Sequence, residues 1–206
     1  MNKKVSIILF AVIAIGALAG YYIWESGSYV AKVGDHKILN HEYTFFLRTQ
    51  KKNAEAEAGA YSEKEIRELW ENPAGGEDPV AIIMNRALEN AKEFKIQLIL
   101  AERENFKLTD SELNEIRQSI DSLLDDKESA KLLLSDLGLN PRQYKDMIIK
   151  RKLVEKYVDN YLRTHNAEMS QYIEKLEEWK NDPAFNLVKN ERVLQKVTNK
   201  SMILPK

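Results

Sequence analysis

The sequence predicts a mainly α-helical protein with a small β-hairpin near its start. Glycine and proline, which interrupt helices, account for only 8 and 5 of the 206 residues. Apolar residues recur at helical spacing over most of the chain after residue 40, as in amphipathic helices that pack around a core. The short segments 30–33 and 37–39, by contrast, flank Gly34-Asp35-His36, a connection typical of a hairpin.

Local signals place the ends of the predicted helices. Three starts carry a capping side chain, two of them followed by proline at the first helical position: Asn40, Asp78-Pro79 and Asn140-Pro141. Thr109 and Glu112 have the spacing of a capping box, in which each side chain satisfies a backbone N–H of the first turn. Gly138 fits the position just past the end of a short helix over 128–137.

Two long helices dominate the pattern. The helix over 80–101 is apolar around more than half of its circumference, so we expect it to lie at the centre of the fold. A second long helix starts at Pro141 and extends to about His165. Beyond it the sequence predicts a helix over 169–180, a possible short strand over Phe185 to Val188 and a last helix over 191–197.

The N-terminal segment, residues 1–28, reads as a signal anchor or a signal peptide. Lys3 and Lys4 precede an uncharged apolar run over residues 5–24, which is long enough to span a bilayer. We therefore expect a single-pass cell-membrane protein that contacts the membrane through residues 5–24, with the bulk of the chain outside the cytoplasm. The alternative is a secreted protein, cleaved after Ala19 in the small-residue pattern Ala17-Leu18-Ala19.

Charge and cysteine content exclude several classes of function. All but Lys3 and Lys4 of the 31 basic residues, and all 32 acidic ones, follow the apolar run, with both signs interspersed. A nucleic-acid-binding surface would instead show clustered basic residues, so we expect no nucleic-acid partner. The chain has no cysteine, which excludes disulfides, thiolate metal sites and a lipid-modified cysteine.

The sequence shows no motif of an enzyme active site. It contains no nucleophile elbow, P-loop, zinc-protease motif or dinucleotide fingerprint. The three histidines are scattered: His36 lies in the turn, His41 in a first helical turn and His165 near a helix end. We therefore expect a protein that is not an enzyme and has no catalytic residue, no metal and no cofactor.

Several apolar helix faces are wider than a short chain needs for its own core. Exposed apolar surface of this kind, lined by aromatic and methionine side chains, is typical of proteins that bind other polypeptides. The candidate polypeptide-binding residues are Phe45, Phe46, Tyr144, Met147 and Tyr161.

The order of elements resembles a known family. The stretch VAKVGDHKILNHEYTFFL is followed by the helix NRALENAKEFKIQLILAERENFKLTDSELNEIRQSI and then by LLLSDLGLNPRQYKDMIIKRKLVEKYVDNYL. This order is similar to the N-terminal chaperone domain of SurA and of the PrsA foldases, and the resemblance covers residues 29–165. In that family the first strands pair with a segment near the C-terminal end. The resemblance therefore implies that residues 166–206 complete the same domain, with Phe185 to Val188 as the partner strand.

The resemblance also implies a function. It predicts an extracytoplasmic chaperone, a holdase or foldase that binds exported unfolded polypeptides without ATP. Family members often carry a parvulin-type prolyl isomerase domain of about a hundred residues after the long helix. Only about forty residues follow that helix here, so we expect no isomerase activity. The alternative function is a structural or scaffold subunit of a cell-envelope complex with one fixed protein partner.

Overall fold

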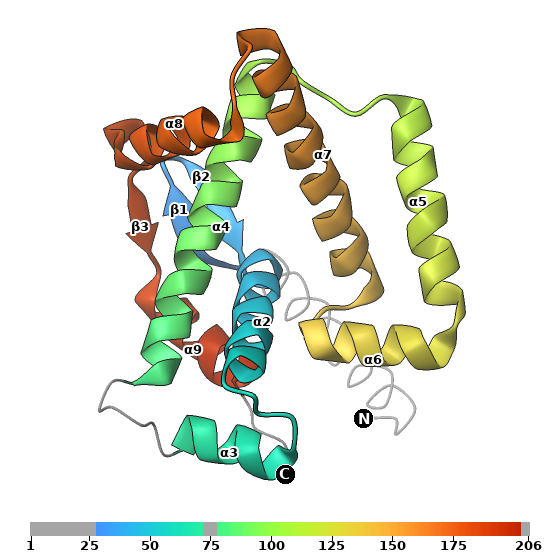
Figure 1. Ribbon diagram of the computed structural model, residues 1–206, viewed down its shortest axis with the longest axis vertical. Helices are drawn as coiled ribbons and strands as arrows, with labels where there is room; N and C mark the ends of the chain where they lie inside the picture. The colour runs from blue at the N-terminus through green and yellow to red at the C-terminus, as the bar shows by residue number, and fades with distance from the viewer. Residues whose placement is uncertain (1–27, 72–77, 203–206) are drawn as a thin grey trace, which may run out of the picture.

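The computed structural model describes residues 28–71 and 78–202, which form a mainly α-helical fold with one small sheet (Figure 1). This confirms the fold class expected from the sequence. The eight α-helices of the described residues are α2 (Asn40–Glu57), α3 (Glu63–Glu71), α4 (Pro79–Arg103), α5 (Asp110–Asp125), α6 (Lys127–Leu137), α7 (Pro141–His165), α8 (Met169–Asn181) and α9 (Glu191–Ser201).

The sheet joins the two ends of the described chain. Strands β1 (Tyr29–Val33) and β2 (His36–Leu39) form the predicted hairpin, and β3 (Leu187–Lys189) pairs antiparallel with the free edge of β1. The late strand expected at Phe185 to Val188 is thus confirmed, with a shift toward the C-terminus. The shift arises because Pro183–Phe185 form a 3₁₀ turn, in which Asp182 Oδ1 accepts a hydrogen bond of 2.8 Å from Ala184 N–H.

Most helix starts follow the predicted caps. The Asn140 side chain accepts from Gln143 N–H at 2.9 Å, and Gln143 Oε1 accepts from Asn140 N–H at 3.0 Å. Asn40 differs from the prediction: it is the first residue of α2, and its side chain donates to Ser28 Oγ instead of capping. The side chain of Glu42 stabilises the start of α2 instead, because its Oε2 accepts a hydrogen bond of 2.8 Å from the backbone N–H of Leu39.

The main core lies between the sheet and helices α2, α4, α8 and α9. Its fully buried side chains include Val30, Ile38, Tyr43, Leu88 and Leu194. Helix α4 contacts α2, α7, α8 and the sheet, which confirms its predicted central position. The core therefore draws on residues from both ends of the described chain.

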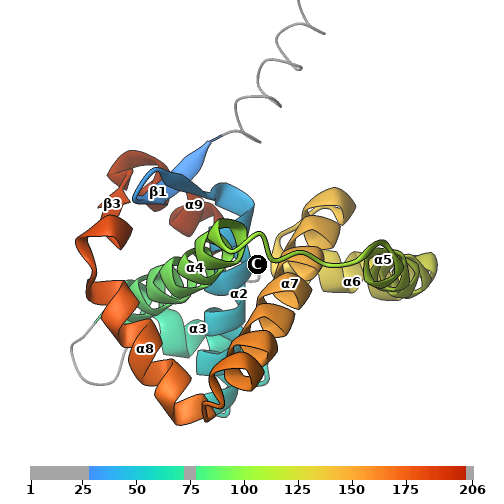
Figure 2. The same ribbon diagram turned by 90° about the horizontal axis from the view of Figure 1, so that it is seen from above.

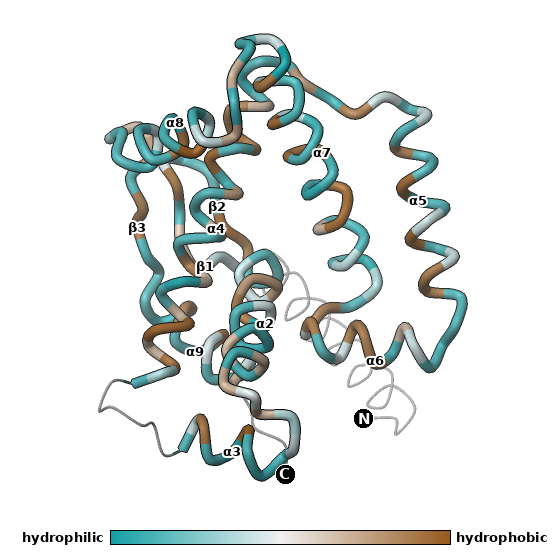
Figure 3. The backbone as a smooth tube through the Cα atoms, in the orientation of Figure 1, coloured by the Kyte–Doolittle hydropathy of each residue, from teal (hydrophilic) through white to brown (hydrophobic). Residues whose placement is uncertain are grey.

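Helices α5 and α6 form what we call the arm, residues 110–137. The arm lies on the far side of α7 from the sheet, and α6 returns to contact α2 (Figure 2). A second apolar cluster fills the space where the arm, α7, α2 and α4 meet. In Figure 3 apolar residues recur along both helices of the arm rather than gathering at one end.

The localisation expected from the sequence requires a correction. Within residues 28–71 and 78–202 no helix is both long enough and apolar enough to cross a bilayer, which contradicts a single-pass membrane protein. The segment on which that expectation rested, the apolar run over 5–24 within the predicted signal region 1–28, lies outside the described residues.

Candidate functional site

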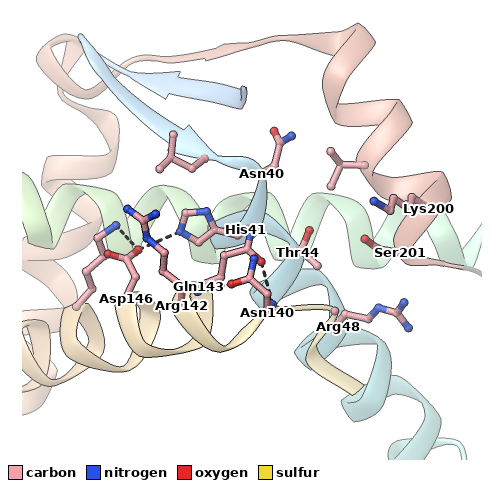
Figure 4. A pocket seen from close by; sticks show the side chains of 14 residues that line it. Asn40, His41, Thr44, Arg48, Asn140, Arg142, Gln143, Asp146, Lys200 and Ser201 are labelled. Carbon is pink, nitrogen blue, oxygen red and sulfur yellow. Dashed lines mark hydrogen bonds and ion pairs between the residues drawn. The ribbon is translucent and has the colours of Figure 1, made fainter. Parts of the chain in front are cut away.

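A polar pocket of about 590 Å³ lies beside α2, between α7 and α9. Its walls come from the first turns of α2, the junction of α6 with α7, the start of α7 and the end of α9. Figure 4 shows Asn40 and His41 on α2, Asp146 on α7 and Lys200 on α9 around this space. Three helices that are far apart in the sequence therefore supply one site.

Behind this pocket lies a network of charged side chains, and the buried carboxylate of Glu42 is at its centre. The side chain of Glu42 is 1% exposed and accepts from Lys95 Nζ at 2.9 Å and from Lys150 Nζ at 3.0 Å. Burial by itself would raise the pKa of Glu42, but the two ammonium groups outweigh burial and hold that pKa below its ordinary value. Glu42 is therefore ionised and ties α2 to α4 and α7.

Asp146 continues the network toward the pocket. It accepts from Lys150 Nζ at 2.7 Å, and its Oδ2 lies 3.0 Å from His41 Nε2. Burial opposes the ionised form, but the hydrogen bonds from His41 and Lys150 lower the pKa of Asp146 to about 2. The same two carboxylates, Glu42 and Asp146, raise the pKa of Lys150 although burial alone would lower it.

The network does not have the arrangement of a nucleophilic active site. A carboxylate–histidine pair activates a nucleophile only when a hydroxyl or thiol lies within hydrogen-bond reach of the imidazole. Among the described residues, the hydrogen-bond partner of the His41 ring is Asp146, and no hydroxyl contacts it. The described part of the chain also contains no group of three or more histidine, aspartate or glutamate side chains able to hold a metal ion. The network's evident role is to fix three helices.

A second recess, of about 570 Å³, is more apolar and lies along α4 and α7. Phe94, Ile148 and Val154 supply its apolar walls, and charged side chains of α7 border it. It lies over the second apolar cluster. Phe94 and Val154 belong to this cluster, as do the residues on the inner side of the arm. Of the arm's own side chains only Ile120 and Ala130 are buried. The other apolar residues of the arm are therefore half-buried or exposed.

The structure separates the five predicted polypeptide-binding residues into two groups. Met147 is fully buried, and Phe45 and Tyr144 are each 7% exposed, so these three build the second apolar cluster rather than its surface. Phe46 is half-buried and packs edge-on against Phe94 with ring centroids 5.4 Å apart. The assignment of all five as binding residues stays a prediction. Because Met147, Phe45 and Tyr144 are buried, Phe46 and Tyr161 are the two of the five whose side chains can contact another chain.

Tyr161 belongs to a separate aromatic group where α7 meets α8. Its ring stacks on His165 at 4.1 Å and meets the rings of Tyr172 and Trp179 edge-on at 5.2 and 5.9 Å. Such edge-to-face contacts stabilise the packing of two helices beyond their apolar area. The structure therefore places Tyr161 at a helix–helix contact, apart from the other four residues.

Sequence reasoning missed the charge network. Glu42, Lys95 and Lys150 look like ordinary charges on amphipathic helices, because the helical pattern does not show which charged residue faces inward. One signal was available: Glu42 lies between His41 and Tyr43 in the first turn of a helix whose apolar face includes Tyr43. A carboxylate beside the buried face of a first turn is a candidate for burial with a cationic partner.

Comparison with known proteins adds no relative: the chain matches no protein-family model, no curated protein and no solved structure.

Proposed function

We propose that the protein is an ATP-independent chaperone, a holdase or foldase that binds apolar segments of unfolded polypeptides. The observation that carries this proposal is the arm, whose apolar residues are numerous and mostly accessible. Leu123 and Leu132 are 48% and 67% exposed. Five more apolar side chains are only partly buried against the second cluster: Ile116, Leu124, Leu133, Leu134 and Leu137. Apolar surface left exposed in this way is a feature of sites that interact with other polypeptides.

The shape of the region supports the same proposal. The arm contacts the rest of the fold through α7 and α2, so its two helices have one side against the second cluster and the other side open (Figures 1 and 2). The apolar recess lined by Phe94, Ile148 and Val154 continues this surface across α7. An unfolded segment can lay apolar side chains against such a surface without a pocket of fixed shape, which suits a binder of many clients. The resemblance of the chain to the SurA and PrsA chaperone domain points in the same direction.

A fixed-partner scaffold is the second candidate, and one feature of α8 favours it. Met169 and Ile173 lie four residues apart on this helix, hence on one face, and are 51% and 53% exposed. A small, well-defined apolar spot is a feature of a surface that packs against one partner. This spot lies on α8, outside the arm.

The test is suppression of aggregation. The purified full-length chain is added to several unrelated proteins as they refold from denaturant, and light scattering is recorded. We expect suppression of every client at near-stoichiometric amounts, and a clear loss of suppression in the double variant Leu123→Ser, Leu132→Ser. The matched control is Tyr61→Ser, because Tyr61 is 81% exposed but lies outside the arm. Failure to suppress any client would reject the chaperone in favour of the scaffold.

A further inference from the structure

The polar pocket between α2, α7 and α9 has more positive than negative charge. Four cationic side chains and one carboxylate line it: Arg48, Arg142, Lys150, Lys200 and Asp146. The carboxylate is already engaged by Lys150 and His41, and Lys150 is also paired with the buried Glu42, so the surplus comes mainly from the two arginines. The chain as a whole has a formal charge of −1, so this surplus is local. A concave site with surplus positive charge attracts anionic ligands.

Arg48 is a wall residue whose neighbouring negative charges are shared with other cations. Its neighbouring carboxylates, Asp136 and Glu55, are each paired with a lysine: Asp136 with Lys52 at 2.5 Å and Glu55 with Lys51 at 2.8 Å. Burial lowers the pKa of Arg48, and the two carboxylates offset this effect only in part. A half-buried guanidinium whose neighbouring anions are shared with other cations is suited to a further anionic partner.

Arg142 supplies a second guanidinium on the opposite wall. It is exposed, and it takes part in none of the ion pairs formed within residues 28–71 and 78–202. In Figure 4 its side chain rises from α7 toward His41, whereas Arg48 lies at the other end of the pocket on α2. Two guanidinium groups at separate ends favour a ligand with more than one negative charge.

Two buried polar atoms of the pocket-lining residues have no partner. Asn40 Oδ1 is an acceptor and Arg48 Nε is a donor, and neither forms a hydrogen bond within the described structure. Buried polar atoms are nearly always hydrogen-bonded, so a bound group that meets either atom after a small rotation of its side chain would complete its hydrogen bonding. Both residues lie on α2 eight positions apart, which corresponds to about 12 Å along the helix axis. One small ion cannot reach both atoms at once.

An extended peptide meets these requirements together. About four residues of extended chain span this distance. A backbone N–H can donate to Asn40 Oδ1, and carboxylate side chains can accept from the arginines in the forked geometry that guanidinium groups favour. The pocket volume of about 590 Å³ is also within the range of ligand sites. Inorganic phosphate offers the charge but neither the length nor an amide N–H.

We propose that this pocket binds an extended acidic peptide segment, held by Arg48 and Arg142 through its carboxylates and by Asn40 through a backbone N–H. The site is chemically distinct from the apolar surface of the arm. It stands whether or not the protein is a chaperone, because none of its residues belongs to the arm or to the second apolar cluster.

The test is a fluorescence-anisotropy titration of the full-length chain with a short labelled peptide rich in glutamate. A peptide with every glutamate replaced by glutamine and inorganic phosphate serve as comparison ligands. We expect the glutamate peptide to bind, and Arg142→Gln and Arg48→Gln each to weaken binding by about tenfold, as for a lost charge-assisted hydrogen bond. Arg163→Gln is the matched control, because Arg163 is an exposed arginine of α7 whose guanidinium contacts Asn160, away from the pocket.

Each other outcome overturns the proposal. Equal binding of the glutamine peptide would remove the role of charge, and equal affinity of the Arg142→Gln and Arg163→Gln variants would place the peptide elsewhere. Displacement of the peptide by phosphate at the peptide's own concentration would assign the pocket to a small anion. If Arg48→Gln fails to fold, the exposed Arg142 still gives the answer. The double variant of Leu123 and Leu132 should bind the acidic peptide unchanged, which separates this test from that of the chaperone.

Discussion

Lys150 Nζ lies 3.0 Å from Glu42 Oε1, although 108 residues separate the two positions in the chain. Lys95 Nζ binds the same carboxylate at 2.9 Å, so one ionised group holds α2, α4 and α7 together. Glu42 is the only carboxylate among the buried residues that the structure describes. A buried ion pair adds little net stability over an apolar replacement, but removing one partner leaves the other charge uncompensated and is strongly destabilising.

Glu42→Gln should therefore lower the free energy of unfolding by about 3 kcal/mol, because Lys95 and Lys150 lose their common counter-charge while the shape of the side chain is kept. Urea titration followed by circular dichroism measures the change. Glu89→Gln is the control, since Glu89 is exposed on α4 and should change stability by less than about 0.5 kcal/mol. Equal effects of the two substitutions would show that the network does not stabilise the fold.

Stability should also fall at acid pH because of Asp146 and Glu42. Both carboxyls have lowered pKa values in the folded protein, that of Asp146 about 2, against ordinary values of about 4 in an unfolded chain. The unfolded state therefore binds protons first, so the contribution of these groups is complete above about pH 5 and is lost as the pH falls toward 2. Urea midpoints measured from pH 7 to pH 3 should decline less in Asp146→Asn than in the unchanged protein. Asp159→Asn, at an exposed position of the same helix, should leave the decline as it is.

Gly138 and Gly59 form a matched pair for the packing at the start of α7. Both have left-handed backbone conformations, with φ of +64° and +68°. A Cβ on Gly138 would lie 3.0 Å from Thr44 Cγ2, whereas one on Gly59 would meet nothing within 4 Å. Gly59→Ala should thus cost about 1 kcal/mol from backbone strain alone, and Gly138→Ala clearly more. Thermal unfolding of the two variants measures the loss of stability in each. Equal losses would mean that the side chain of Thr44 moves aside without a measurable loss of stability.

Phe185 tests whether the C-terminal segment completes the core. This side chain is 2% exposed, belongs to the last residue of the 3₁₀ turn before β3 and has the guanidinium of Arg103 5.0 Å from the centre of its ring. Phe185→Ala should lower the free energy of unfolding by about 3 to 4 kcal/mol through the lost apolar burial and the cavity left behind. Val188→Ala is the control, because Val188 lies in β3 itself but is 56% exposed. A small, equal effect of both variants in urea would show that the segment is an addition to an independent fold.

The local signals in the sequence predicted most of the individual elements. Capping pairs such as Thr109 with Glu112 act between residues three positions apart, so they depend little on the rest of the chain. Gly138 ends α6 for a similarly local reason, the left-handed conformation that it adopts there. Asn40 shows the limit of such reasoning: its side chain binds Ser28, twelve residues away, because the hairpin folds back beside α2.

The sequence by itself therefore determined the helical class, the hairpin and most helix ends, since these follow from interactions within a few residues. Only the tertiary structure decided which charges are buried and which residues share a site. Glu42 with Lys150, His41 with Asp146 and the walls of the polar pocket all join positions about a hundred residues apart. The spacing of residues along one helix fixes the direction in which a side chain points, but the path of the whole chain fixes what it meets there.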